Sequence, residues 1–79
     1  MKTTLSMPRV SMNMEEGTIT AWHKREGESF AKGEPLYDIE TEKVISEVEA
    51  PSDGTLCRIL VPVDATAEVG TPVCEIETD

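Results

Sequence analysis

A repeat with a spacing of 37 residues constrains the fold of this chain more than any other feature. Residues 17–41 align with residues 54–78, and the aligned pairs include Gly33 with Gly70. Because glycines and prolines set backbone turns, their recurrence predicts the same turns in both halves, related by a two-fold pseudo-axis. The first-half residues that recur unchanged are Gly17, Thr18, Gly33, Pro35, Ile39, Glu40 and Thr41.

The segments between these turns are short, rich in β-branched residues and bounded by Gly, Pro and Asp, which is typical of β-strands. No stretch sustains helical periodicity over three turns. The sequence therefore predicts an all-β fold of two small antiparallel sheets, packed as a sandwich or flattened barrel. The expected strands are residues 17–23, 36–41, 44–49, 54–61 and 73–78.

The junction of the two halves is the link Glu42-Lys43, if the repeats run over residues 6–42 and 43–79. The pseudo-axis then places Lys43 exposed at one end of the molecule, and the region of Ser6 and Asp79 at the opposite end. Since Glu and Lys adopt positive φ poorly, we expect a type I turn or a wider loop here rather than a type I′ hairpin turn.

The length and net charge of the chain limit the classes of function and partner that it can have. With 79 residues, the chain is one domain, residues 1–79, with little interior for an enclosed active site, which favours a carrier, binding or scaffold role. Its 16 acidic and 7 basic residues give a net charge of −9, which disfavours nucleic acid and anionic membranes as partners. No apolar run has membrane-spanning length and no secretory signal is evident, so we expect the bacterial cytoplasm or the mitochondrial matrix.

The cysteines and the histidine predict no chemistry of their own. Cys57 and Cys74 lie in apolar segments and are expected to be reduced thiols in or near the core, although a disulfide is the alternative. A zinc site needs about four ligands, which His23 cannot complete, so no metal site is predicted. His23 lacks a Ser, Cys or carboxylate partner at a recognisable spacing, and we expect it on the surface. Trp22 and Phe30 are expected in the core.

Residues 39–44, I-E-T-E-K-V, resemble the I-E-T-D-K-A signature of lipoyl domains, which belong to the acyltransferase components of 2-oxo acid and acetoin dehydrogenase complexes. Met7-Pro8 and residues 11–19 resemble the opening M-P-x-x-x-x-M-x-x-G-T-I of that family. Residues 49–54 match its E-A-P-x-x-G turn. The resemblance covers nearly the whole chain, and departs from the pattern at Glu42, where Asp is typical, and at Val44, where Ala is common.

The resemblance implies a flattened barrel of two four-stranded sheets and a lysine, Lys43, that carries amide-linked lipoic acid at a hairpin tip. The arm would carry acyl groups and reducing equivalents, and the chain itself would be a non-catalytic, monomeric carrier. The implied partners are a lipoyl ligase or transferase, a thiamine-diphosphate-dependent decarboxylase, an acyltransferase core and dihydrolipoamide dehydrogenase.

Further residues are expected to take part in recognition by the ligase or by a partner enzyme. The segment that begins at Met12 corresponds to a loop near the lysine, although its methionines alternatively pack into the core. The acidic residues Asp38, Glu47 and Glu49, with neighbours, are either a solvated face or a docking collar. The recognition candidates are Glu40, Glu42, Gly27, Gly33, Met12, Asn13, Glu15 and Glu16.

Two rival functions remain open. Biotinyl domains share the fold, but their lysine typically lies in A-M-K-M, whereas Lys43 is flanked by Glu42 and Val44. An unmodified adaptor of the same fold is the other rival, with Lys43 an ordinary surface residue. An enzyme is disfavoured because the sequence shows no catalytic constellation.

Overall fold

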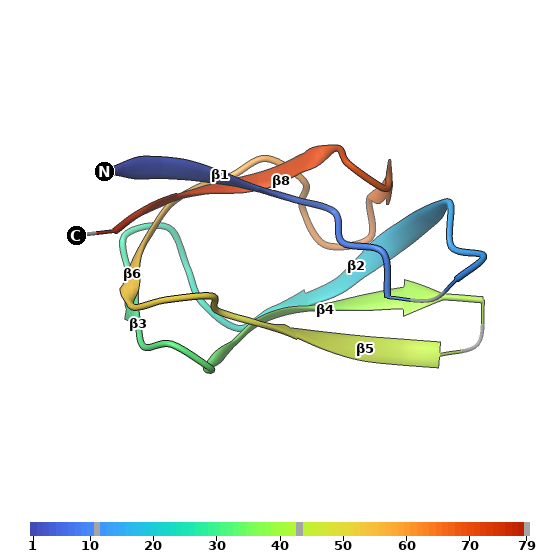
Figure 1. The fold of residues 1–79 in the computed structure, drawn as a ribbon, viewed down its shortest axis with the longest axis horizontal. Coiled ribbons are helices and arrows are strands. Elements are labelled where there is room, and N and C mark those ends of the chain that lie inside the picture. The colour runs from blue at the N-terminus through green and yellow to red at the C-terminus, as the bar shows by residue number, and fades with distance from the viewer. Residues whose placement is uncertain (11, 43, 79) are drawn as a thin grey trace.

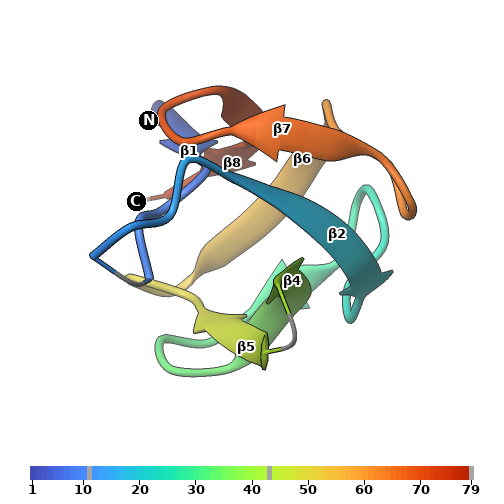
Figure 2. The same cartoon turned by 90° about the vertical axis from the view of Figure 1, so that its right-hand side faces the viewer.

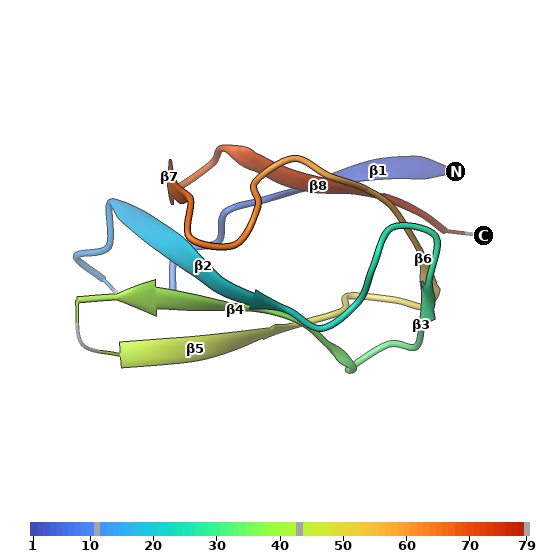
Figure 3. The ribbon, with the colours of Figure 1, turned by 180° about the vertical axis from the view of Figure 1, so that it is seen from behind.

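The computed structural model describes residues 1–10, 12–42 and 44–78. These form two four-stranded antiparallel sheets that face each other in two layers (Figures 1 and 3). The all-β prediction, with two four-stranded sheets, is confirmed; the sheets stay separate and do not close into a barrel. The strands are β1 (Lys2–Ser6), β2 (Glu16–Trp22), β3 (Ser29–Phe30), β4 (Pro35–Thr41), β5 (Val44–Glu49), β6 (Gly54–Ile59), β7 (Thr66–Glu68) and β8 (Pro72–Glu77).

The strand order repeats as the sequence does. One sheet has the order β1-β8-β6-β3 and the other β5-β4-β2-β7, so a two-fold operation exchanges β1 with β5, β2 with β6, β3 with β7 and β4 with β8. The irregularities repeat too: the β2–β4 ladder shifts register between Ile19 and Ala21, and the β6–β8 ladder between the equivalent Leu56 and Arg58. The predicted pseudo-symmetry is therefore present in the hydrogen bonding as well as in the turns.

The core lies between the sheets and consists of side chains that alternate inward along the strands. Its fully buried members include equivalent pairs, such as Ile19 with Leu56 and Ile39 with Ile76. Phe30 is buried as predicted, and Trp22 packs against the core from its edge. Cys57 and Cys74 are free thiols, half-buried and buried respectively, which confirms the prediction of reduced cysteines.

Three strands were not predicted, and one is shorter than predicted. β1 has the sequence KTTLS with a single large apolar residue, and β3 and β7 have only two and three residues. Such short or mainly polar edge strands carry almost no hydrophobic periodicity. The predicted strand 54–61 ends at Ile59, because the chain bends at residues 60 and 61, whose N–H groups both donate to the carbonyl oxygen of Val73.

The proposed boundary of the first repeat at Ser6 is wrong. Ser6 pairs with Pro72 as Glu49 pairs with the equivalent Pro35, so Ser6 corresponds to Glu49 and not to the junction. Ten residues, 7–16, separate β1 from Gly17, where the matching part of the repeat begins, whereas four residues, 50–53, separate β5 from the equivalent Gly54. The first connection is thus six residues longer, and this is the main departure from symmetry.

The chain ends lie at the opposite end of the molecule from the β4–β5 connection (Figure 1). Thr78 donates its backbone N–H to the carbonyl oxygen of Met1, 2.8 Å away, which holds the two ends side by side. The predicted separation is confirmed for the chain ends Met1 and Thr78 but is wrong for Ser6, which lies at the end of β1 away from the termini. Lys43 and Asp79 lie outside the described residues. Within the described chain, there is no helix of the length and apolarity that a membrane crossing requires.

Candidate functional site

The β4–β5 hairpin forms the end of the molecule that lies away from the termini. Thr41 of β4 pairs with Val44 of β5, so the connection consists of two residues, Glu42 and Lys43. Glu42 is exposed and has φ 54°. The expectation of a type I turn is therefore wrong at Glu42, which takes the left-handed conformation at a cost of about 1–2 kcal/mol for a side chain of this kind. Lys43 lies outside the described residues.

The long β1–β2 connection runs beside this hairpin (Figures 1 and 2). Arg9 organises it: the guanidinium donates to the carbonyl oxygens of Met14, at 2.8 Å, and Met12, at 3.4 Å. The Val10 backbone N–H donates to Met14 Sδ at 3.3 Å. Met14 is buried while Met12 is 89% exposed. The alternative in which the methionines pack into the core is therefore confirmed for Met14 and wrong for Met12, whose part in recognition stays a prediction.

Gly17 brings the connection and the hairpin together. A Cβ at this position would lie 3.0 Å from Met14 Cε, 3.4 Å from Met7 Sδ and 3.5 Å from Thr41 Cγ2. A side chain here would displace the flexible end of Met14 by a few tenths of an ångström, so glycine allows the two methionines and the end of β4 to pack closely around this position. Gly17 thus helps to hold the β1–β2 connection against the hairpin. Its recurrence as Gly54 had predicted only a shared backbone turn.

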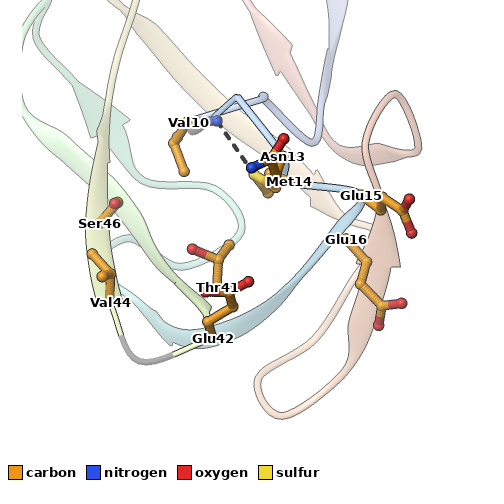
Figure 4. A pocket seen from close by; sticks show the side chains of 9 residues that line it. All are labelled: Val10, Asn13, Met14, Glu15, Glu16, Thr41, Glu42, Val44 and Ser46. Atoms are coloured by element: carbon orange, nitrogen blue, oxygen red, sulfur yellow. Dashed lines mark hydrogen bonds between the residues drawn. The ribbon is translucent and has the colours of Figure 1, made fainter.

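A groove of about 380 Å³ lies between the β1–β2 connection and the hairpin (Figure 4). The predicted recognition residues Asn13, Glu15, Glu16 and Glu42 all line it, so residues distant in sequence meet as the resemblance implied. The remaining lining residues, which were not predicted, are Val10, Met14, Thr41, Val44 and Ser46.

Three carboxylates give this groove a negative charge. In the described part of the chain, the side chains of Glu15, Glu16 and Glu42 form no ion pair. Exposed apolar side chains flank them: Val44 is 61% and Ile45 is 60% exposed. An acidic rim beside exposed apolar residues is suited to transient contact with a basic protein surface.

The acidic residues predicted as a collar are spread along the hairpin rather than gathered at its tip. Glu40 pairs with Ile45, one step from the tip. Asp38 and Glu47 pair with each other two steps further away, and Glu49 lies at the far end of β5. Of these residues, only Glu40 and Glu42 are close to the tip, and the docking role of the collar stays a prediction for these two.

Gly27 and Gly33, also predicted to take part in recognition, do not line the groove. They flank β3, at the end of the molecule that holds the termini (Figure 1). Both have positive φ, 94° and 87°, and their N–H groups donate to the carbonyl oxygens of Leu56 and Ala50. Their geometry gives them a turn-forming role, and their part in recognition stays a prediction.

His23 has a carboxylate partner that the sequence spacing did not reveal. Its Nε2 lies 2.9 Å from Oδ1 of Asp38 on β4, which forms an ion pair when the ring is protonated. The prediction that His23 lies on the surface is confirmed, but the statement that it lacks a carboxylate partner is wrong. Cross-strand pairing, which sequence spacing does not encode, brings the two together.

Comparison with known proteins identifies related domains. The biotin and lipoyl family, described as "Biotin-requiring enzyme", matches residues 3–76. The chain is 45% identical over 67 residues to a dihydrolipoyllysine-residue acetyltransferase component of an acetoin cleaving system from Pseudomonas putida. It is 39% identical over 70 residues to the Bacillus subtilis component of the same name. These matches cover 85% and 89% of this chain but 18% of each relative.

A solved structure matches along its full length. The lipoyl domain of the 2-oxoglutarate dehydrogenase complex from Azotobacter vinelandii is 31% identical, with a TM-score of 0.80. The match covers 95% of both chains. The correspondence therefore extends to a complete, separately folded domain, whereas the two acetyltransferase components are several times longer than this chain.

Proposed function

Because the chain belongs to the biotin- and lipoyl-attachment family and corresponds over its length to a lipoyl domain, we propose that lipoate, amide-linked to Lys43, is its cofactor. The observation that carries this proposal is the pairing of Thr41 with Val44, which leaves a two-residue connection between β4 and β5. The lysine of the matching motif is one of these two residues in the sequence. The chain is a non-catalytic carrier domain, so the attached group supplies the chemistry and the protein supplies its position.

The residues beside Lys43 fit lipoate better than biotin. The biotinyl motif has methionine on both sides of its lysine, whereas this chain has Glu42 and Val44. Glu42 lies in the groove between the hairpin and the β1–β2 connection, together with two further carboxylates. An enzyme that attaches lipoate would meet this acidic rim as it approaches the lysine, and a basic surface around its active site would be complementary.

In this proposal the hairpin serves as the base of a swinging arm. When attached, lipoate would supply a dithiolane able to take up an acyl group at a decarboxylase and release it to coenzyme A at an acyltransferase core, and dihydrolipoamide dehydrogenase would reoxidise the resulting dithiol. Tethering raises the effective concentration of the arm at each of these sites. A carrier of this kind would act in a 2-oxo acid or acetoin dehydrogenase complex of the bacterial cytoplasm or mitochondrial matrix.

Reductive acylation tests this function. The lipoylated chain would be incubated with thiamine-diphosphate-dependent decarboxylases specific for acetoin, pyruvate and 2-oxoglutarate, each with its substrate, and its mass would be followed. The proposal expects one decarboxylase to add an acyl group to the wild-type chain and none to add one to Lys43→Arg. If no decarboxylase acylates the lipoylated chain, while each acylates the domain of its own complex, the carrier function is wrong.

A further inference from the structure

His23, Asp38 and Glu47 form a cluster on the outer face of the β5-β4-β2-β7 sheet, and we propose that it binds a divalent transition-metal ion of the Zn²⁺ type. One nitrogen or carboxylate oxygen from each residue lies within 4.8 Å of the other two. The cluster is three residue pairs away from the Thr41–Val44 pair at the hairpin tip. The proposal is therefore independent of the carrier function.

Three adjacent strands hold the ligands in place. Asp38 lies on β4, Glu47 lies opposite it on β5, and His23 follows directly after β2. The backbone N–H of His23 donates to the carbonyl oxygen of Leu36, at 2.8 Å, so the residue is fixed to β4 as well. Ligands fixed on neighbouring strands lose little conformational freedom when an ion binds.

The two carboxylates of the cluster favour the binding of a cation. Asp38 and Glu47 are a directly opposed cross-strand pair, and like charges in such a pair destabilise a sheet. The Asp38 side chain is only 23% exposed, so water screens it incompletely. A bound divalent ion would replace this repulsion by two favourable interactions.

The donor set selects the class of ion. The His23 ring nitrogen and Asp38 oxygen are 2.9 Å apart, so a small outward movement brings them to the spacing of about 3.3 Å for two tetrahedral ligands bound about 2.0–2.1 Å from one ion. An imidazole nitrogen favours Zn²⁺ and its neighbours over Mg²⁺ and Ca²⁺, which prefer oxygen ligands alone. Three protein ligands leave the remaining coordination to water.

The other half of the molecule supplies a built-in control. Its equivalent positions hold Leu60, Glu75 and Thr4, only one of which is a metal-ligating residue. The cluster is thus not a by-product of the repeat, and Glu75 provides a carboxylate in the same setting as Asp38 without the other two ligands.

Calorimetric titration with Zn²⁺ would test the site. The untagged chain would carry Lys43→Arg, which prevents attachment of a metal-binding dithiol, and Cys57→Ser, which removes the more accessible thiol. We expect saturable one-to-one binding that His23→Gln and Glu47→Gln each weaken about tenfold or more. Glu75→Gln should leave it unchanged, and Mg²⁺ should not compete.

A lack of saturable Zn²⁺ binding would overturn the proposal, as would full affinity for Zn²⁺ in both His23→Gln and Glu47→Gln. An equal loss of affinity in Glu75→Gln would also overturn it, because Zn²⁺ would then associate with the acidic surface in general. Circular dichroism would establish that each variant is folded. A rise in melting temperature with Zn²⁺, absent from His23→Gln, is the expected second readout.

Discussion

Tyr37 and Cys74 occupy equivalent positions of the two halves, one on β4 and one on β8, and 1% and 0% of their surfaces are exposed. Burial raises the pKa of both groups, and that of the Cys74 thiol reaches about 12. The core of this small domain thus contains two ionisable side chains that are stable only in their neutral forms.

The first prediction concerns thiol reactivity. Cys57 is half-buried, whereas Cys74 is fully buried and burial raises its pKa, so only Cys57 offers a thiol that reagents in solution can reach. Iodoacetamide at pH 8 should add one group to the native chain and two to the unfolded chain, as counted by intact mass. Cys57→Ser should take up none while folded. Labelling of native Cys74 at the rate of Cys57 would contradict the burial described.

The second prediction concerns alkaline pH. Because the pKa of Cys74 is raised in the folded state, the unfolded chain releases this proton first as the pH rises above 9.0. The contribution of Cys74 to stability is therefore full below pH 9.0 and is lost as the pH rises toward 12. The slope is at most about 1.4 kcal/mol per pH unit for one proton.

The control for this prediction is Cys74→Ala. Under reducing conditions, urea unfolding at several values above pH 9 should show a shallower loss of stability in this variant than in the wild type. Some slope should remain, because burial also raises the pKa of Tyr37. Identical slopes in both proteins would show that Cys74 does not titrate with folding.

The third prediction compares the equivalent glycines Gly17 and Gly54. An added Cβ at Gly54 would lie 2.6 Å from the backbone oxygen of Glu77, which cannot move away without disturbing β8. At Gly17 the nearest atom, at 3.0 Å, is the flexible end of Met14. We expect Gly54→Ala to cost about 3 kcal/mol or more and Gly17→Ala about 1 kcal/mol.

Thermal unfolding measures this difference, since about 1 kcal/mol shifts the melting temperature of a domain of this size by roughly 4–8 °C. Equal shifts for the two variants would contradict the different packing of the two halves at these positions.

The repeat made much of the fold predictable from sequence. Glycines and prolines recur where the chain turns, so the central strands and the hairpin end follow from residues 17–41 and 54–78 alone. The six additional residues of the β1–β2 connection were not predictable, because they interrupt the repeat before its first matching glycine. Ser6 was misplaced for this reason.

The site was predictable as a set of residues but not as an arrangement. Motif resemblance predicted that Glu15 and Glu42 belong together, and they line one groove. The supporting contacts of Arg9 and Gly17 depend on backbone carbonyls and on methionine packing, which leave no pattern in a single sequence. The pairing of His23 with Asp38 likewise arises from strand register.

The fourth prediction concerns the positive φ of Glu42. Asn adopts this conformation at little cost, so Glu42→Asn should stabilise the domain by roughly 0.5–1 kcal/mol. If the lipoyl ligase recognises the Glu42 carboxylate, Glu42→Asn should also lower the kcat/KM of the ligase for this domain. Glu42→Gln removes the charge without changing the backbone preference, so it should reduce kcat/KM without raising stability. Full ligase activity in both variants would show that Glu42 has no part in recognition.

The proposed carrier function depends above all on lipoate being attached to Lys43. The most direct test is the intact mass of the chain after separate co-expression with a lipoyl ligase and lipoate, and with a biotin ligase and biotin. We expect a single lipoyl increment with the first ligase, no increment with the second, and complete loss of the lipoyl increment in Lys43→Arg but not in Lys32→Arg. A biotinyl increment, an unchanged mass with both ligases, or a lipoyl increment that survives in Lys43→Arg would contradict it.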